Sequence, residues 1–523
     1  MAQHRRIARA LLGVVLVALA MRLAWLGTRV AHWDEARHAL RTLQFQQTGV
    51  YRYHPVLHGP LLFEANEVVF DLLGPTDATM RLVPALVGAA LPAAAWLYRD
   101  HLGADEVVGV AVVLAANPIL VFYSRFARSD VLVAAFAVAF LGSVLRARAT
   151  GRSRYALLGG GLLALAAASK ENVVLYLAAW LGASTLVALF HPAVAAGDPL
   201  GTRVETVLWR VAIGVRTRAL AILGGGLLFF ATTVALYAPR GVDGPSFADL
   251  ADPAAIPDVV AASTVRPVHL VLDFWVFGPV RGEHSPLGFL ALLAGLLLVG
   301  AAATVGLALW TLREEWRSRP LLAFAGLWAA ASFVGYPLAT DLLTAWIAVH
   351  VVVALALPAG VGLARSVRQA RRSRGRRIAL AAVLAYLLVT VALTSYVAPG
   401  ARYNPLTQPS QMSGDVRPAL QAIETADAPG PEVAYVGPYF DRENWTHRLP
   451  FAWYAQRSGA DVTAVSTVEE LPDRPPPVVI GLEDRRAAME RALPDHRCSS
   501  YVRVPWVNFD PQGFDRDTVV CVA

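Results

Sequence analysis

The chain has 523 residues, of which 56% are hydrophobic and only 16% are charged, and this composition is too apolar for a soluble globular protein. A mean hydropathy of +0.48 indicates instead an α-helical protein that crosses a membrane many times. The net charge of +7 does not indicate a nucleic-acid partner, because the basic residues are unevenly spread and no basic-aromatic motif accompanies them.

The predicted membrane domain comprises residues 1–398. About eleven segments are long and apolar enough to satisfy their own backbone hydrogen bonds inside a bilayer. They are 7–26, 79–98, 106–123, 131–147, 155–168, 173–190, 219–238, 286–310, 320–336, 342–364 and 378–398. The fifth segment is short, but without it the seven arginines of 365–377 would lie on the external side.

The basic residues between these spans predict the orientation of the chain. If the N-terminus is cytoplasmic, the cytoplasmic segments hold 22 basic residues and the external segments of the membrane domain hold 10. Cytoplasmic loops usually carry this excess. We therefore expect a multi-pass protein of the cell membrane, with a cytoplasmic N-terminus and with the loops 27–78 and 239–285 on the external face.

Residues 399–523 are predicted to form a small external α/β domain. The stretches 431–440 and 475–484 have the composition of buried strands, and each is followed by a helical stretch. Cys498 and Cys521 are the only cysteines of the chain. We expect them to pair as a disulfide, because disulfides persist outside the cytoplasm, and two buried free thiols are the alternative.

The first external loop carries adjacent acidic residues in "HWDEARHAL". Asp34 and Glu35 open an amphipathic stretch that we expect to lie on the membrane surface, with Leu40, Leu43 and Phe45 toward lipid. The acids could simply cap the start of a helix. Alternatively, a carboxylate there could deprotonate an acceptor hydroxyl or bind a divalent cation, Mg²⁺ or Mn²⁺, with Asp34 as its ligand. The two interpretations are compatible.

Further polar residues lie in the same loop and in the next external turn. His58 precedes a Gly-Pro pair, which can hold a side chain in place or simply make a turn. The turn "YSRFARSD" contains Arg125, Arg128 and Asp130. Paired arginines suit a phosphate group through bidentate contacts. In the alternative interpretation, one arginine pairs with Asp130 and the other extends to lipid headgroups.

The turn "SKEN" contains the only lysine among the 46 basic residues of the chain. We therefore expect Lys170 to be required as a compact ammonium group that contacts a phosphate oxygen, with Glu171 and Asn172 beside it. Chance retention of one lysine is the alternative. Glu283 and His284, before the eighth predicted span, are weaker candidates for substrate binding, since single polar residues at membrane edges are often interfacial anchors.

From residue 34 onward the chain contains, in order, "DEA", "TGVY", "HGPLLF", "LLG" and "MRLVPALVGA". This series resembles the first external loop and second span of the GT-C membrane glycosyltransferases, the superfamily of protein mannosyltransferases and aminoarabinose transferases. With "YSRFARSD" and "SKEN", the chain most resembles the archaeal flippase-activity-associated proteins of the N-glycosylation pathway. "NWTHRLPFAWYAQRSG" also resembles a C-terminal stretch of that branch.

The resemblance implies sugar transfer from a polyprenyl-phosphate carrier, such as dolichyl phosphate, to an acceptor on the external face. It assigns the catalytic acid of the first loop to Asp34, with Glu35 beside it. The implied partners are the lipid-linked sugar, membrane lipid and proteins of a glycosylation pathway. The chain departs from the family where Gly59-Pro60 replaces a Pro-Pro pair and where "TDLLTAW" lacks a charged pair. A non-catalytic protein that binds the lipid-linked sugar, or helps it cross the bilayer, is the rival hypothesis.

Overall fold

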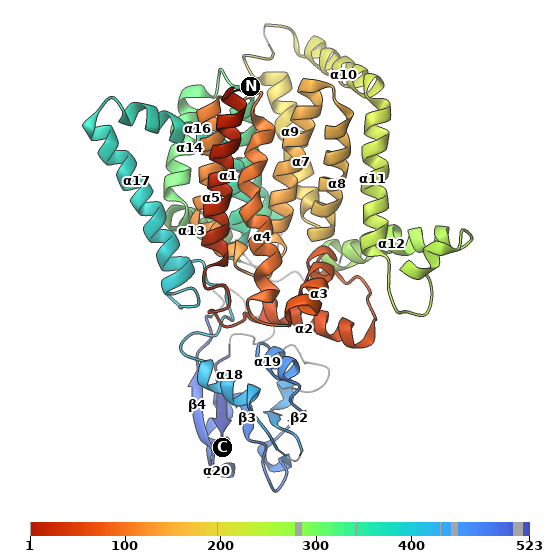
Figure 1. The fold of residues 1–523 in the computed structure, drawn as a ribbon, viewed down its shortest axis with the longest axis vertical. Coiled ribbons are helices and arrows are strands. Elements are labelled where there is room, and N and C mark those ends of the chain that lie inside the picture. The colour runs from red at the N-terminus through yellow and green to blue at the C-terminus, as the bar shows by residue number, and fades with distance from the viewer. Residues whose placement is uncertain are drawn as a thin grey trace.

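The computed structural model describes residues 2–195, 197–277, 285–339, 344–428, 430–440, 448–505 and 516–523. A bundle of long helices and a smaller sheet domain follow one another along the long axis of the molecule (Figure 1). The N-terminus lies at the end of the bundle far from the sheet domain, which contains the C-terminus. The helix bundle therefore has one end that faces the C-terminal domain and one end that faces away from it.

The bundle is built from helices of very different lengths. Its members are α1 (Ala2–Leu23), η2 (Thr79–Arg81), α4 (Leu82–Ala90), η3 (Leu91–Tyr98), α5 (Ala104–Ala116), α6 (Pro118–Ser124), α7 (Asp130–Thr150), α8 (Ser153–Ser169), α9 (Val173–Phe190), α11 (Ala219–Tyr237), α13 (Pro286–Gly300), α14 (Ala302–Glu315), α15 (Pro320–Ala339), η6 (Ala345–Ile347), α16 (Ala348–Ala370), α17 (Arg374–Ala392) and η7 (Leu393–Val397). Outside it lie α2 (Trp33–Thr48), η1 (Pro55–Leu57), α3 (Leu61–Leu73), α10 (Leu200–Thr217), η4 (Phe247–Ala251), α12 (Ile256–Val271) and η5 (Leu272–Val276).

The predicted membrane domain is helical and apolar as expected, but the count of eleven spans is not confirmed. Among the described residues, eight helices are long and apolar enough to cross a membrane. The count is ten if two bent pairs each form one span: α5 with α6, bent by 54°, and α13 with α14, bent by 98°. α8 runs beside α7 and α11 (Figure 1), although its 17 residues are too few for the same criterion. α12 with η5 meets the criterion, yet α12 lies crosswise near α3.

The bundle is assembled around α16, and the apolar part of this helix is completely buried. Glycines let neighbouring helices approach it closely. A Cβ atom at Gly360 would lie 2.4 Å from the Cα atom of Val110 on α5. Because small residues at a crossing allow backbone-to-backbone contact, this position fixes α5 against the centre of the bundle.

The apolar face of α2 packs on protein, so the expectation that it faces lipid is wrong. The side chains of Leu40, Leu43 and Phe45 are only 4%, 8% and 8% exposed. Leu40 and Leu43 share a core with residues of the C-terminal domain, including Trp453, while the Phe45 ring lies 5.2 Å from that of Phe63 on α3. The amphipathic pattern was interpreted correctly as a helix, but part of its apolar side is covered by a segment about 400 residues away in sequence and part by α3.

The C-terminal domain contains the predicted α/β elements. They are α18 (Arg417–Glu424), β1 (Val433–Val436), η8 (Pro438–Phe440), α19 (Phe451–Ser458), β2 (Val462–Val465), η10 (Val468–Glu470), β3 (Val478–Leu482), η11 (Glu483–Arg485), α20 (Arg486–Ala492), β4 (Arg497–Tyr501) and β5 (Thr518–Val522). The sheet order is β2-β1-β3-β5-β4. β1 is parallel to β2 and β3, while β5 is antiparallel to β3 and β4. β1 and β3 lie inside the two predicted strand stretches and are fully buried.

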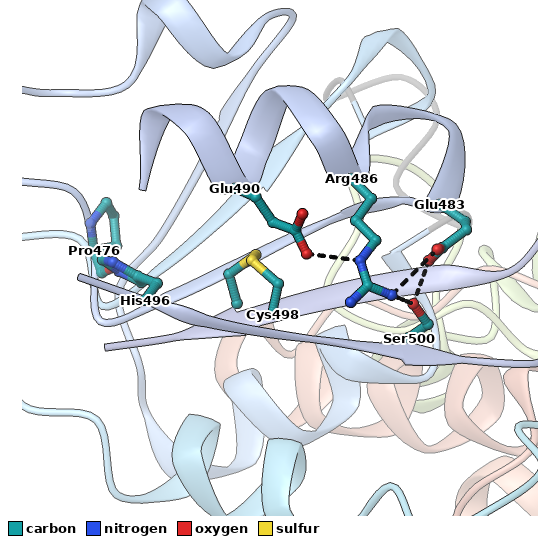
Figure 2. Close-up of a disulfide and its surroundings, with 8 residues drawn as sticks. Pro476, Glu483, Arg486, Glu490, His496, Cys498 and Ser500 are labelled. Atoms are coloured by element: carbon teal, nitrogen blue, oxygen red, sulfur yellow. Dashed lines mark hydrogen bonds and ion pairs between the residues drawn. A yellow bond between two sulfur atoms is a disulfide. The ribbon is translucent and has the colours of Figure 1, made fainter. Parts of the chain in front are cut away.

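The predicted disulfide is confirmed, and the alternative of two free thiols is wrong. Cys498 of β4 and Cys521 of β5 are directly paired across the antiparallel ladder and are joined through their sulfur atoms. Figure 2 shows this disulfide beside α20, whose Arg486 contacts Glu490 at 2.8 Å and Ser500 at 2.5 Å. The bond therefore links two neighbouring strands on the α20 side of the sheet.

Candidate active site

The polar segments that the sequence singled out lie together at the end of the bundle that faces the C-terminal domain. These segments are the start of α2, the turn between α6 and α7, the turn between α8 and α9, and the loop after η1. Ion pairs join them across 40 to 113 positions of sequence, as between Lys170 and Asp130 or between Glu171 and His58. Two separate buried networks result, one around Glu35 and one around Asp34.

Glu35 is fully buried, and both of its carboxylate oxygens accept several hydrogen bonds. Oε1 accepts from Arg29 at 2.9 Å, from Arg81 Nε at 2.8 Å and from the Ala127 amide at 2.8 Å. Oε2 accepts from Arg81 Nη2 at 2.9 Å and from the His32 amide at 3.0 Å. Burial alone would raise the pKa of Glu35, but the two guanidinium groups hold that pKa well below its usual value. Glu35 is therefore an ionised anchor whose acceptor positions are occupied.

The start of α2 gives the two adjacent acids different roles. The His32 ring accepts a hydrogen bond from the Asp34 amide at 3.1 Å, and the Glu35 carboxylate accepts one from the His32 amide at 3.0 Å. This reciprocal pair is a capping box, which satisfies amide groups that the first helical turn leaves without partners. The capping interpretation therefore applies to His32 and Glu35, and the Asp34 side chain is left for other contacts.

The carboxylate of Asp34 belongs to the second network, although its side chain is also buried. Oδ1 accepts from Arg37 Nη2 at 2.5 Å, and Oδ2 pairs with Arg128. Arg128 also donates through Nε to Asp130 at 3.0 Å and lies 3.6 Å above the centre of the Trp346 ring. Arg128 therefore bridges two carboxylates while the indole fixes the plane of its guanidinium.

Asp130 places Lys170 beside Arg128. The Lys170 ammonium donates to Asp130 Oδ1 at 2.7 Å, and Asp130 Oδ2 accepts from Arg128. His350 Nε2 lies 3.5 Å from Asp130 Oδ1, and Asn172 Nδ2 contacts the same ring nitrogen at 3.0 Å. Burial lowers the pKa of the Lys170 ammonium, and the nearby Asp130 carboxylate opposes that change. The one lysine of the chain is therefore a buried cation paired with an anion.

His58 connects this network to the loop after η1. Its Nδ1 lies 3.0 Å from Glu171 Oε2, and its Nε2 lies 3.5 Å from Arg128 Nη2. The φ angle of His58 is +60°, which is uncommon for a residue with a Cβ atom. At Gly59 a Cβ atom would lie 2.1 Å from a carbonyl oxygen in the last turn of α8, so only glycine fits. The loop is thus held in a strained conformation that keeps His58 on the network.

Several buried polar atoms of the second network have no hydrogen-bond partner within the described part of the chain. They are Arg37 Nε, His38 Nε2, Ser129 Oγ and Asn172 Oδ1. Buried polar groups are normally satisfied, so atoms of this kind indicate a place for a polar ligand or water. By contrast, both carboxylate oxygens of Glu35 accept hydrogen bonds from described residues.

The described surroundings of Asp34 are cationic, and the divalent cation expected there stays a prediction. Within the described ranges, no three His, Cys, Asp or Glu side chains come together as metal ligands. Each carboxylate oxygen of Asp34 contacts a guanidinium group. Cations next to a carboxylate suit an anionic ligand instead of a metal ion. Glu283 and His284 lie outside the described residues.

Arg125 lies apart from both carboxylates and holds the end of α1. Its guanidinium donates to backbone carbonyl oxygens of Met21, Arg22, Ala24 and Trp25 at 2.5 to 3.3 Å. These carbonyls lie at or just beyond the helix C-terminus, where intrahelical donors are missing. The structure therefore places Arg125 in the packing of α1, and Arg128, Asp130, Lys170, Glu171, Asn172 and His58 in the second network.

Other members of the networks were not predicted from the sequence. They are Arg29, His32, Arg37, His38, Tyr53, Arg81, Trp346 and His350. His350 could have been found, because an ionisable residue inside the apolar run "WIAVHVVV" is costly in a membrane and is often functional.

The C-terminal domain holds the loop between α3 and α4 and the start of α2. Asp77 in that loop accepts hydrogen bonds from Trp453 at 2.9 Å, Tyr454 at 2.8 Å and Arg457 at 2.8 Å, all on α19. The Tyr454 hydroxyl also accepts from the Ala31 amide at 2.9 Å. α19 therefore positions both segments that supply the Glu35 network.

Two family models match parts of the chain. Residues 57–196 match the model of dolichyl-phosphate-mannose-protein mannosyltransferase, and residues 416–522 match the C-terminal domain of the Agl23 flippase-associated protein. The first match includes His58, Arg128, Asp130 and Lys170 of the second network. No curated protein sequence matches the chain.

Solved structures of membrane glycosyltransferases share the fold. ArnT from Cupriavidus metallidurans in the apo state aligns with a TM-score of 0.58 and 17% identity over 98% of this chain and 97% of that one. ArnT bound to undecaprenyl phosphate aligns with a TM-score of 0.56 and 18% identity over the same shares. The apo oligosaccharyltransferase from Archaeoglobus fulgidus aligns with a TM-score of 0.52 and 13% identity, over 93% of this chain and 71% of that one.

The chain therefore has the fold of the GT-C membrane glycosyltransferases, and the two matched segments agree with the resemblance predicted from its motifs. Its residues 416–522 are similar to the C-terminal domain of the Agl23 flippase-associated protein.

Proposed function

We propose that this protein transfers a sugar from a polyprenyl-phosphate donor, such as a dolichyl-phosphate sugar, to an acceptor at the external membrane surface. The observation that carries the proposal is the buried second network, in which Arg128 and Lys170 lie side by side next to Asp34. The ArnT structure with bound undecaprenyl phosphate supports the class of lipid carrier, because its fold is similar.

The donor phosphate is the natural ligand of Arg128 and Lys170. A guanidinium group can contact two phosphate oxygens at once, and an ammonium group adds a compact charge. In the absence of phosphate these cations pair with Asp34 and Asp130, which keeps the buried charges neutralised. Phosphate binding would replace some of these contacts to carboxylate oxygens with contacts to phosphate oxygens.

In the proposed step, an oxygen or nitrogen of the acceptor forms a bond to the anomeric carbon of the sugar. The bond between that carbon and the phosphate oxygen breaks, and polyprenyl phosphate leaves with the electron pair. Arg128 and Lys170 stabilise the charge that develops on the phosphate. The proton of the acceptor passes to the Asp34 carboxylate, which acts as general base. Glu35 takes no part in proton transfer.

The orientation is part of the proposal. The excess of basic residues in one set of loops supports a cytoplasmic N-terminus, with the site and the C-terminal domain on the external face. Topology reporters fused after residue 375 and after residue 430 should report opposite sides of the membrane. The same side for both fusions would contradict an external site.

A second candidate function is binding of the lipid-linked sugar without transfer, in support of a flippase or another pathway protein. The match of residues 416–522 to a flippase-associated domain favours it. In this case the same cations would bind the phosphate, but Asp34 would serve only as their counter-ion.

Reconstituted protein separates the two candidates. Purified chain in liposomes is given radiolabelled dolichyl-phosphate mannose or glucose together with a membrane extract as acceptor source. Label that moves from the lipid fraction to an acceptor supports transfer; saturable binding of the donor without such movement contradicts it and supports the second candidate. Parallel samples with EDTA, and with EDTA plus excess Mg²⁺ or Mn²⁺, test the divalent cation expected from the sequence, which stays a prediction.

A further inference from the structure

The helix α10 (Leu200–Thr217) stands apart from the bundle at the end opposite to the candidate active site (Figure 1). It connects α9 and α11, both of which are long and apolar enough to cross a membrane. Its two ends are therefore held at one surface of the bilayer. None of its residues is buried, so the protein covers neither side of this helix.

The sequence of α10 is strongly amphipathic. With 100° per residue, one face collects six of the apolar residues, Leu200, Val204, Val207, Leu208, Val211 and Val215, while Trp209 and Ile213 lie on the other side. Val211 is 57% exposed and Leu208 is 64% exposed, although an apolar face of this width is normally covered. Arg203, Arg210 and Arg216 lie beside this face and opposite to it. The helix thus has an uncovered apolar face and arginines that can reach the same surface.

We propose that α10 lies in the interface of an anionic lipid bilayer, with its apolar face in the acyl region and its arginines on lipid phosphates. Three observations carry this inference: both neighbouring helices are candidate spans, the apolar face is uncovered, and the helix carries three arginines against one glutamate. Arginine side chains that flank an apolar face bind anionic headgroups and leave the acyl region to the aliphatic side chains. This surface is separate from the donor site and serves to anchor the connection between α9 and α11.

Spin labelling of the full chain tests the inference. The two native cysteines form a disulfide, so a new cysteine is the only free thiol and can be labelled selectively. Val211→Cys places the label on the apolar face, and Thr206→Cys is the matched control on the polar face. Both variants are reconstituted in nanodiscs of phosphatidylcholine alone and of phosphatidylcholine with phosphatidylglycerol, and label accessibility to oxygen and to a water-soluble nickel chelate is measured.

With phosphatidylglycerol, the label at Val211 should be accessible to oxygen and protected from the nickel chelate, and the label at Thr206 should show the reverse. Replacing Arg210 and Arg216 by glutamine should remove the added protection that phosphatidylglycerol gives at Val211. A Val211 label as accessible to nickel as the Thr206 label would overturn the proposal. Shielding from both reagents would also overturn it, because a protein surface would then cover the helix. Equal protection in both lipid mixtures would contradict the preference for anionic lipid.

Discussion

Glu35 and Asp34 are neighbours in sequence, but they belong to two regions of the molecule that differ in how their polar atoms are used. Around Glu35, two arginines and two backbone amides fill the acceptor positions of one buried carboxylate. Around Asp34, cations and carboxylates alternate, and buried atoms such as His38 Nε2 and Asn172 Oδ1 have no partner among the described residues.

This difference separates a buried charge that stabilises the fold from one that can bind a ligand or take part in a reaction. A network without spare donors or acceptors fixes the backbone, and its members cannot exchange partners without losing stability. A network whose cations share carboxylates can exchange one anion for another, such as a phosphate group. On this basis Glu35 holds α2 in place, and we propose Asp34 as the acid that acts on a substrate.

The largest effect on stability is expected for Glu35→Gln. This change removes the negative charge between Arg29 and Arg81 and leaves two buried cations without a counter-ion, at a cost of about 3–5 kcal/mol. The melting temperature of the purified protein in detergent measures the loss. Asp34→Asn is the matched control and should lose less, since Arg128 keeps Asp130 as a partner and Arg37 keeps the Val56 carbonyl oxygen. Equal losses for both variants would remove the distinction between the two networks.

A smaller effect is expected for Lys170→Met on the affinity for polyprenyl phosphate. Loss of one charged hydrogen bond to the phosphate should cost about 1.5–3 kcal/mol, or roughly 10- to 150-fold in affinity. Calorimetric titration of the protein in nanodiscs with the lipid phosphate measures this change. Lys170→Arg keeps the charge and should lose less affinity. Unchanged binding by folded Lys170→Met would place the phosphate elsewhere.

The smallest effect is expected for Asp77→Asn, which weakens the contact between α19 and the membrane domain. The change removes the ion pair with Arg457 but keeps the shape of the side chain. We expect the activation free energy of transfer to rise by about 1 kcal/mol, which lowers kcat roughly fivefold, with little change in the KM of the donor. Rates of sugar transfer at varied donor concentration measure it. Glu424→Gln removes the other carboxylate partner of Arg457 and serves as control. The same loss in both variants would show that Asp77 does not position the site.

The sequence predicted the class of fold and most of the second network because local signals carry that information. Span length, the distribution of arginines and the single lysine, Lys170, can be recognised in the sequence without knowing which residues they contact. The cover over Leu40 and Leu43 was not predictable, because it comes from Trp453 in a distant domain. The number of spans was also not predictable, since the pattern of 286–310 does not reveal the 98° bend between α13 and α14.

The sequence also could not show which of the two acids, Asp34 or Glu35, completes the helix cap. Both residues fit a helix cap by position, and only the contacts of His32 show that Glu35 completes the capping box. Arg37 lies one turn after Asp34 and could belong to any exposed helix face by sequence pattern alone. Arg81 is a charged residue at the start of an apolar segment, where an interfacial position would have been the ordinary expectation.

The most direct test of the central claim is the rate of sugar transfer by Asp34→Asn protein reconstituted in lipid. Asparagine keeps the shape of the side chain but cannot accept the proton, so we predict a rate about 10²–10⁴-fold below the parent rate. The variant should stay folded, with a smaller loss of melting temperature than Glu35→Gln, and should keep measurable affinity for the lipid phosphate. Transfer at close to the parent rate by folded Asp34→Asn protein would contradict the assignment of Asp34 as the base.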